Sequence, residues 1–171
     1  MSTLIISSSP RKGMYSDRMA DMVKEMKGGE IVRLREKKIA SCLACEYCHR
    51  KEGNLCIQKD DMTGLYDAFR KADTLVLLSP IYWWQVNAQM KAFIDRLYAL
   101  GHEDWKGKKV AVILNGGAED DDVEFRILHD AFSEMFSYLG VDFRYLGIGT
   151  VDEEAFDKKK DRIRSFIEEN I

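Results

Sequence analysis

Near its start the chain reads Thr3-Leu-Ile-Ile-Ser-Ser-Ser-Pro-Arg-Lys-Gly-Met-Tyr-Ser16. The apolar run Thr3–Ser7 has the length of a buried strand, and Ser16–Lys27 has the periodicity of a helix. The phosphate loop, Ser7–Ser16, brings hydroxyls, two cations and a glycine to the start of that helix. Because free amides at a helix N-terminus bind anions, this loop predicts a phosphate cradle. The alternative is a solvated turn in which Ser16 caps the helix.

Apolar runs of strand length alternate with helical segments along the rest of the chain. The expected strands are Thr3–Ser7, Ile31–Leu34, Thr74–Ser79, Lys109–Asn115 and Phe143–Leu146. The expected helices are Ser16–Lys27, Met62–Lys71, Val86–Leu100, Val123–Leu139 and Glu153–Glu169. Short buried strands separated by helices indicate a parallel sheet with helices on both faces. We therefore predict an α/β fold of three layers in a single domain, residues 1–171, with a doubly wound sheet of five parallel strands in the flavodoxin-like order 2-1-3-4-5.

Composition excludes several classes of partner. The 171 residues carry 26 basic and 29 acidic side chains, well mixed, for a net charge of −3. With no basic stripe and no basic amphipathic helix, we expect no nucleic-acid and no membrane partner. The apolar runs are too short to cross a bilayer. No signal peptide precedes the first strand, so we expect a cytoplasmic protein without structural disulfides.

Two further loops follow expected strands, at the edge where such sheets bind ligands. The aromatic loop contains Pro80, Ile81, Tyr82 and Trp83. It forms a stiff rim for a planar ring, or else an aromatic contact at a subunit interface. The glycine loop contains Asn115, Gly116, Gly117 and Glu119. Its glycines allow a ligand to approach the backbone, although an ordinary turn explains this loop almost as well.

All four cysteines fall within fifteen residues, at Cys42, Cys45, Cys48 and Cys56. Two residues between thiols let a loop turn successive sulfurs toward one centre, as zinc and iron–sulfur clusters require. Three cysteines at this spacing with a fourth nearby favour a [4Fe–4S] cluster over zinc. Zinc and unmetallated thiols are the alternatives. The cysteines lie in an insertion, here called the cysteine segment, over about residues 35–61, which we expect to be an ordered functional loop.

Several charged residues are expected to be structural. Lys91, Asp95 and Arg96 should form ion pairs. Asp61 should cap the second helix, and the acidic run 119–122 should mark the start of a later one.

Motifs in a fixed order cover most of the chain. They are Ser9-Pro-Arg-Lys-Gly13, then Cys42-x2-Cys45-x2-Cys48 with Asp60-Asp-Met62 downstream, then Ser79-Pro-Ile-Tyr-Trp83 and Ala88-Gln-Met-Lys-x-Phe-Ile-Asp-Arg96. Jointly they resemble the NADPH-dependent FMN reductase family, and within it the iron–sulfur flavoprotein branch. Members of the family are typically dimers or tetramers with flavin sites close to a subunit interface, so the resemblance implies a homodimer or homotetramer.

The resemblance implies FMN, with its phosphate in the phosphate loop and its isoalloxazine ring on the aromatic and glycine loops. The implied cofactor-binding residues are Ser7, Ser9, Arg11, Lys12, Gly13, Met14, Tyr15, Ser16, Pro80, Ile81, Tyr82, Trp83, Asn115, Gly116, Gly117 and Glu119. The implied metal ligands are Cys42, Cys45, Cys48 and Cys56. The sequence also departs from the family pattern. Ser8 replaces the first glycine of the phosphate loop, Met14-Tyr15 occupies its Gly-Asn region, and the gap from Cys48 to Cys56 is long.

The activity implied by the resemblance is FMN-dependent oxidation of NADPH or NADH. Electrons would pass to an unidentified small-molecule or redox-protein acceptor, in single steps if the cysteines hold a cluster. Because the flavin carries the chemistry, no catalytic side chain is predicted. A flavodoxin-like electron carrier without a nicotinamide site is the second hypothesis, and a module that binds structural zinc is the third. The sequence leaves NADPH against NADH open.

Overall fold

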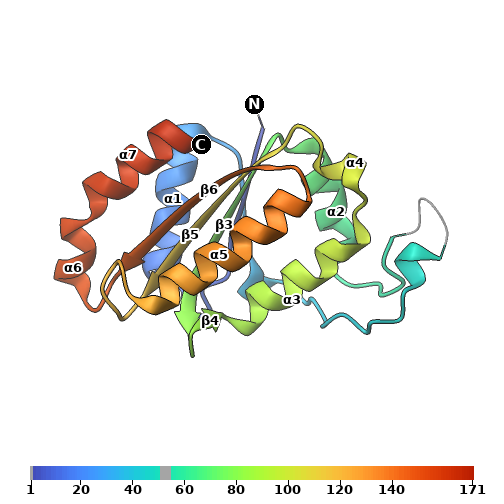
Figure 1. The fold of residues 1–171 in the computed structure, drawn as a ribbon, viewed down its shortest axis with the longest axis horizontal. Coiled ribbons are helices and arrows are strands. Elements are labelled where there is room, and N and C mark those ends of the chain that lie inside the picture. The colour runs from blue at the N-terminus through green and yellow to red at the C-terminus, as the bar shows by residue number, and fades with distance from the viewer. Residues whose placement is uncertain (1, 51–54) are drawn as a thin grey trace.

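A computed structural model describes residues 2–50 and 55–171, so part of the cysteine segment lies outside the described residues. Five parallel strands form the sheet in the order β2-β1-β3-β5-β6 (Figure 1). Their bounds are β1 Thr3–Ser7, β2 Glu30–Arg33, β3 Thr74–Tyr82, β5 Lys109–Gly116 and β6 Asp142–Gly149. Counted along the parallel strands alone, this is the predicted order 2-1-3-4-5, and the flavodoxin-like fold is confirmed.

Helices cover both faces of this sheet (Figure 1). The helices are α1 Tyr15–Lys27, α2 Met62–Lys71, α3 Ala88–Arg96, α4 His102–Trp105, α5 Val123–Tyr138, α6 Glu153–Lys158 and α7 Lys160–Asn170. Short 3-10 turns lie at Leu34–Glu36, Tyr47–His49 and Leu97–Ala99. Helices α1, α6 and α7 pack on one face, and α2, α3 and α5 pack on the other.

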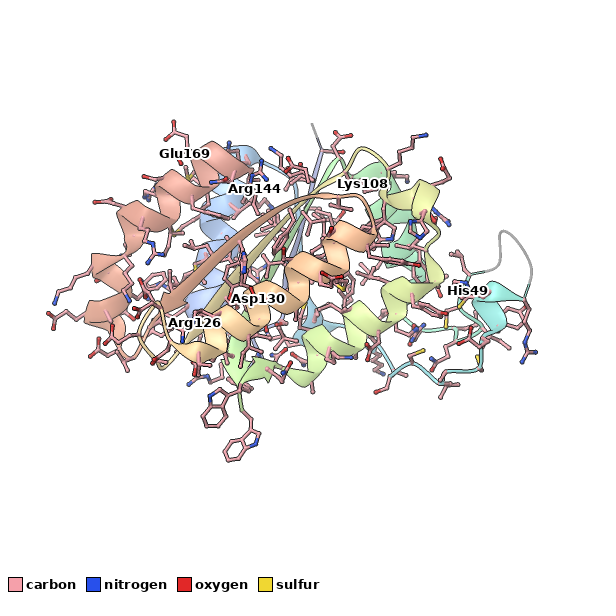
Figure 2. All side chains as sticks on the ribbon, viewed as in Figure 1. His49, Lys108, Arg126, Asp130, Arg144 and Glu169 are labelled. Carbon is pink, nitrogen blue, oxygen red and sulfur yellow. The ribbon has the colours of Figure 1, made fainter. Side chains whose placement is uncertain are left out.

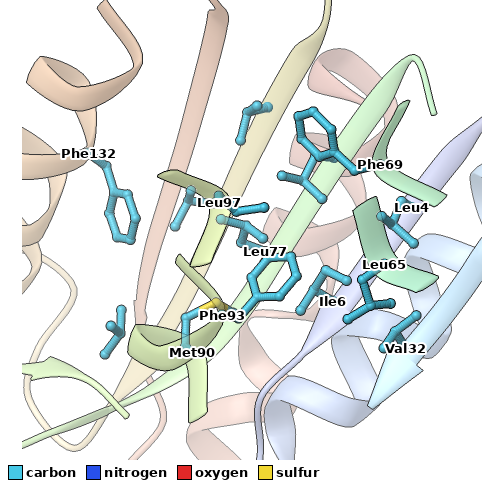
Figure 3. Packing of buried hydrophobic residues seen from close by; sticks show 14 of the residues in the cluster. Leu4, Ile6, Val32, Leu65, Phe69, Leu77, Met90, Phe93, Leu97 and Phe132 are labelled. Carbon is cyan, nitrogen blue, oxygen red and sulfur yellow. The ribbon is translucent and has the colours of Figure 1, made fainter. Parts of the chain in front are cut away.

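The pleat of the strands divides the core into two clusters. Successive side chains of a strand point to opposite faces. In β3, Leu75 and Leu77 therefore join the cluster under α2, α3 and α5, whereas Val76 and Leu78 join the cluster under α1 and α7. Figure 3 shows the first cluster, in which Leu77 and Phe93 lie between the sheet and α3. Strands buried on both faces explain why the sequence shows unbroken apolar runs.

The structure differs from the sequence-based expectation in several elements. The expected helix Val86–Leu100 is shorter, because α3 spans Ala88–Arg96 and a 3-10 turn follows it, and the short helix α4 was not expected. Strand β3 continues past the expected end at Ser79 and pairs antiparallel with an unexpected short strand, β4 Gln85–Val86. The long last helix is instead two helices, α6 and α7, which meet at Lys159. The Lys159 ammonium bonds to Gly149 O (2.8 Å) and to Asp120, which ties this break to the end of β6.

Asp61 occupies the N-cap position of α2, as expected, but its side chain makes no capping hydrogen bond. Asp60, not Asp61, accepts a hydrogen bond from Met62 N, at 3.1 Å. The Asp61 carboxylate accepts from Lys38 N at 2.7 Å and so holds the cysteine segment instead. The expected pair of Lys91 and Asp95 forms, at 2.5 Å. Over the described part of the chain, no helix is both long and apolar enough to cross a membrane.

Candidate functional site

The phosphate loop is organised around a buried carboxylate, Asp17, in the first turn of α1. Ser7 Oγ donates to it at 2.6 Å, Gly13 N at 3.0 Å and Arg35 at 2.8 Å. Burial alone would raise the Asp17 pKa above its usual 3.8, but these hydrogen bonds and the charge of Arg35 lower it. Asp17 is therefore a charged anchor that fixes both ends of the loop. Arg35 also donates to Ser9 O, at 3.3 Å.

The start of α1 is open to an anion. Met14 occupies the N-cap position, and its side chain makes no capping hydrogen bond. The first amides of a helix have no partner within the helix, so they are available to a phosphate. Arg11 and Lys12 are exposed beside them. Ser16 lies within α1 and does not cap it. This contradicts one part of the solvated-turn alternative, the expected capping of the helix by Ser16.

Buried hydrogen bonds join the three loops. Ser16 Oγ donates to Asn115 Oδ1 at 2.6 Å, which connects the phosphate loop to the glycine loop. Asn87 Nδ2 donates to Ser8 O at 2.5 Å, which connects the phosphate loop to the chain following the aromatic loop. Thr150 N donates to Gly116 O at 2.7 Å. The carboxyl ends of β1, β3, β5 and β6 are thereby held as one unit.

The aromatic loop lies in the hairpin of β3 and β4: Pro80 to Tyr82 form the end of β3, and Trp83 stands at the hairpin tip. Tyr82 pairs with Gln85, and the two residues between them have positive φ angles, 52° at Trp83 and 60° at Trp84. Hairpins of this kind normally place glycine or asparagine there, because other side chains are strained at positive φ. Trp83 is 88% exposed. The strained tip thus presents a large aromatic face to the surroundings.

The glycine loop begins with the last two residues of β5, Asn115 and Gly116, and is crowded on one side. A Cβ atom on Gly116 would lie 2.8 Å from Glu124 Oε1, and one on Gly149 would lie 2.1 Å from Ala118 O. A Cβ on Gly117 would meet nothing within 4 Å, so this residue borders open space. Glu119 is exposed at the start of the turn into α5, where Asp122 Oδ2 accepts from its backbone N.

The structure brings most of the sequence-predicted flavin residues to one edge of the sheet. Ser7, Ser9, Ser16, Pro80, Asn115 and Gly116 are buried there. The Tyr15 ring stacks on Phe156 of α6, at 4.9 Å between centroids.

Asp17, Arg35, Asn87 and Thr150 support this edge and were not identified from the sequence. The contacts through which Arg35, Asn87 and Thr150 hold this edge join residues 18, 79 and 34 positions apart, so no local pattern predicts them. One sequence feature could have identified Asp17, namely its position directly after Ser16 in the first turn of the expected helix. A different feature could have identified Arg35, namely its position directly after the second expected strand.

The cysteine segment lies to the side of the sheet edge, as the position of His49 in Figure 2 shows. His49 Nε2 is 2.9 Å from Tyr98 O, so the segment contacts the chain that follows α3. All four cysteines line a cavity of about 790 Å³, together with Trp105 and Tyr138. The four thiols therefore face a common space.

The thiols do not converge on one point. Among residues 2–50 and 55–171, no three His, Cys, Asp or Glu side chains are gathered closely enough to hold a metal ion. Burial raises the pKa of Cys48, and the charges of Cys56 and Cys42 raise it further. Four cysteine sulfurs are suitable ligands for zinc or an iron–sulfur cluster. Binding one such centre would require the sulfurs to move closer to one another.

Comparison with known proteins identifies the family. A profile of the NADPH-dependent FMN reductases matches residues 1–138. An iron–sulfur flavoprotein of Archaeoglobus fulgidus is 39% identical over 114 residues, which are 63% of this chain and 51% of that protein. The chain thus spans about half the length of that relative.

Two solved structures share the fold. The NAD(P)H:quinone oxidoreductase from Methanothermobacter marburgensis has a TM-score of 0.77 at 18% identity, over 99% of this chain and 98% of that one. An FMN-dependent NADH-azoreductase from Bacillus anthracis, solved in complex with FMN, has a TM-score of 0.70 at 16% identity, over 98% of both chains. The architecture, the matched profile and the relatives agree, and the chain belongs to the NADPH-dependent FMN reductase family.

Proposed function

We propose that this protein is an FMN-dependent NAD(P)H oxidoreductase. The observation that carries the proposal is the buried hydrogen-bond system that joins the strand ends, above all the bond from Ser16 to Asn115. It holds an open helix N-terminus, an exposed aromatic hairpin and a glycine loop at one edge of the sheet. Family membership supports FMN as the cofactor and NAD(P)H as its reductant.

In this proposal the phosphate loop binds the FMN phosphate. Ser9, Arg11 and the first amides of α1 would hold its charge, with Lys12 and the backbone of Gly13 to Tyr15 alongside. Pro80 to Trp83 would lie against the ring, and Asn115 to Gly117 would approach its pyrimidine edge, with Glu119 beside it. Bound FMN supplies hydride acceptance from a nicotinamide and electron release to an acceptor. The chain itself positions the two rings and offers amides to developing negative charge.

The cysteines add a second proposed centre. Cys42, Cys45, Cys48 and Cys56 would hold a [4Fe–4S] cluster, which passes electrons singly. The support is their spacing, their common cavity and the name of the Archaeoglobus relative. We further propose a cytoplasmic homodimer or homotetramer. The free state of the four thiols and the exposed Trp83 at the hairpin tip support these two assignments.

Anaerobic purification followed by an absorption spectrum and an iron assay tests the proposal. We expect a yellow protein that NADPH or NADH bleaches, with iron lost in a Cys42→Ser variant while FMN stays bound. A protein that neither retains nor binds FMN would contradict the proposal. Bound FMN that NAD(P)H does not bleach would instead favour an electron carrier between protein partners. Zinc without iron or flavin would favour the structural module.

A further inference from the structure

The cavity of about 790 Å³ lies between the cysteine segment and the helical layer formed by α3, α4 and α5 (Figure 1). Its walls include four buried apolar side chains, Leu97, Leu100, Trp105 and Phe136. Among the described residues, those that line it include none from the phosphate, aromatic or glycine loops. Binding sites for small molecules have volumes of about 300–1,000 Å³ and mostly apolar walls. The cavity therefore has the size and character of a ligand site, and it is separate from the proposed flavin edge.

The cysteine segment, which covers this cavity, is closed at its base by hydrogen bonds. Asp61 Oδ2 accepts from Lys38 N at 2.7 Å, and Asp60 Oδ2 accepts from Ala40 N at 3.0 Å. The chain that enters the segment thus lies against the chain that leaves it.

Arg96, in the last turn of α3, joins this base to the helical layer and is 2% exposed. Its guanidinium forms the expected ion pair, with Asp60 at 2.7 and 3.0 Å, and also donates to Ala40 O at 2.9 Å. Gln58 Nε2 donates to Ser41 O at 3.0 Å and adds a further link across the base. Because cover and wall are held together, the cavity exists before a ligand enters it.

Exposed apolar side chains gather at the cavity. Leu43 and Ile57 of the cysteine segment, Tyr98, and Tyr138 of α5 all line it, and they are between 48% and 73% exposed. Scattered exposed apolar residues are ordinary, but a contiguous group of them marks a surface that binds something. Covering these side chains would add the favourable burial of apolar surface to the binding of a ligand.

Two of these side chains are tyrosines that lie against imidazole rings. His49 Nε2 is 2.9 Å from Tyr98 O, and the centroids of the two rings are 4.2 Å apart. The ring of Tyr138 lies 5.1 Å from that of His102, in an edge-to-face arrangement. Positioned rings of this kind bind another flat ring through offset-stacked or edge-to-face contacts. The lining therefore favours a planar aromatic molecule.

The charges of the lining disfavour an anion. Among the described residues, the lining contains Glu46 and Asp95 but neither lysine nor arginine. Asp95 pairs with Lys91 at 2.5 Å, and Glu46 Oε2 accepts from the Tyr98 hydroxyl at 3.4 Å. Moving an anion into an apolar cavity with no cation beside it is costly. The phosphates of FMN and NAD(P)H are therefore excluded, and an uncharged molecule is favoured.

We propose that this cavity is a second ligand site, for an uncharged planar aromatic molecule that lies against Tyr98 and Tyr138. Binding there requires neither flavin nor a metal at the cysteines, because the apolar walls come from the helical layer. In the proposed oxidoreductase the molecule would lie next to the thiol-lined end of the same cavity. That consequence rests on the proposed function, whereas the binding itself does not.

Trp105, which is 3% exposed in the cavity wall, reports binding by its fluorescence. The chain has three tryptophans, so replacing Trp83 and Trp84 by phenylalanine leaves Trp105 as the single one. The probe is 2-(hydroxymethyl)anthraquinone, which is uncharged and planar and has no ring position to which a thiol adds. We expect saturable quenching of the Trp105 fluorescence in the full chain.

Anthraquinone-2-sulfonate is the matched probe, because it has the same ring system and carries a negative charge. It should bind at least about tenfold more weakly, a difference of about 1.4 kcal/mol. Quenching by the uncharged probe that does not saturate, or equal dissociation constants for the two probes, overturns the proposal.

Filling the cavity should block the site. Gly101 lines the cavity at a φ of −80°, and a Cβ atom added to it would meet nothing within 4 Å. Gly101→Leu should therefore raise the dissociation constant of the uncharged probe about tenfold without straining the backbone. Gly64→Leu is the control, because a Cβ on Gly64 of α2 also meets open space but that residue is not in the lining. An unchanged dissociation constant in Gly101→Leu overturns the proposal.

A second variant tests the charge argument and decides the question if Gly101→Leu does not fold. Met135 of α5 is partly buried in the cavity lining. Met135→Lys adds a cation there, so anthraquinone-2-sulfonate should then bind at least as tightly as the uncharged probe. A preference that stays as in wild type overturns the proposal.

Two further measurements identify other places and occupants. Ser16→Ala, which alters the proposed flavin edge, should leave the dissociation constant of the uncharged probe unchanged, and a parallel loss of FMN and probe binding overturns the proposal. Sedimentation velocity detects a second copy of the chain in the cavity. A smaller assembly for Gly101→Leu than for Gly64→Leu, with no quenching in the parent protein, shows that a second copy fills it and overturns the proposal. Failure of the protein to bind FMN removes the proposed function, and the quenching result still decides the cavity.

Discussion

The hydroxyl of Ser16 donates a hydrogen bond to Asn115 Oδ1, across 99 positions of sequence. Both side chains are buried, at 1% and 6% exposure. Asn115 in turn donates to Thr150 Oγ1, at 3.3 Å. The start of α1, the end of β5 and the end of β6 therefore keep a fixed spacing, which is the spacing that the proposed flavin site depends on.

Removing the Ser16 hydroxyl should loosen this spacing. Ser16→Ala leaves Asn115 Oδ1 buried and unpaired, which costs about 1–3 kcal/mol of unfolding free energy. We expect FMN affinity to fall about tenfold, a loss of about 1.4 kcal/mol. Urea unfolding and quenching of flavin fluorescence measure the two effects. Ser137→Ala, at an exposed position on α5, is the control and should change neither.

Asp17 should make stability depend on acid pH. Its pKa is lower in the folded protein than the usual 3.8, so the unfolded chain takes up the proton first as the pH falls. The stability that charged Asp17 contributes is complete at neutral pH and is lost as the pH drops through the folded-state value. Asp17→Asn should therefore lower the melting temperature most at neutral pH, with the difference from wild type shrinking below about pH 4.

Calorimetry over this pH range measures the difference. Asp21→Asn is the matched control, because Asp21 lies on the same helix and pairs with Arg33 at 2.7 Å but is exposed. A difference between wild type and Asp17→Asn that stays constant with pH would argue against a charged Asp17.

Replacing Trp83 should affect thermal stability and FMN binding in different directions. At φ 52° a tryptophan is strained by roughly 1–2 kcal/mol, which asparagine tolerates better. Trp83→Asn should thus leave the melting temperature unchanged or raise it, yet weaken FMN binding by removing the aromatic face. Thermal melts and FMN titrations separate these effects. Unchanged FMN affinity would show that Trp83 is not part of the proposed flavin site, and would favour a role for Trp83 at a subunit interface.

Replacement by alanine should destabilise the protein at Gly149 but not at Gly117. A Cβ on Gly149 would lie 2.1 Å from the backbone oxygen of Ala118, and backbone cannot yield as a flexible side chain can. Gly149→Ala should cost about 1–3 kcal/mol and displace the glycine loop, with reduced FMN binding. Gly117→Ala is the control, because open space surrounds that position. Urea unfolding of both variants tests this, and equal stabilities would contradict the crowding.

Strands β1, β3 and β5 were predictable because each is a buried apolar run, and the parallel direction of the strands follows from their alternation with helices. Strand β4 was not, because a two-residue strand gives no pattern and Trp83-Trp84 lacks the glycine or asparagine that marks such a turn. The break at Lys159 depends on Asp120, which lies 39 positions away in sequence.

The loops of the candidate site were predictable for a similar local reason, since each follows a strand at the carboxyl edge. The residues that hold the loops together were not. Asn87 reaches Ser8 across 79 positions, and Arg35 reaches Asp17 across 18. Polar contacts of this kind exist only once the sheet has formed, so a single sequence contains no periodic trace of them.

Hydrogen bonds between residues 38–41 and residues 58–61 close the cysteine segment at its base, which makes it a structurally distinct unit of the chain. Asp61 Oδ2 accepts from Lys38 N at 2.7 Å and Asp60 Oδ2 accepts from Ala40 N at 3.0 Å, so the two ends of the segment are held together whatever the length of chain between them. Closing a longer loop between fixed ends costs only about 0.6 kcal/mol for each doubling of its length. Such a segment could be lengthened, shortened or moved onto a related sheet as one unit, so that gain or loss of the proposed redox centre would leave the host fold in place.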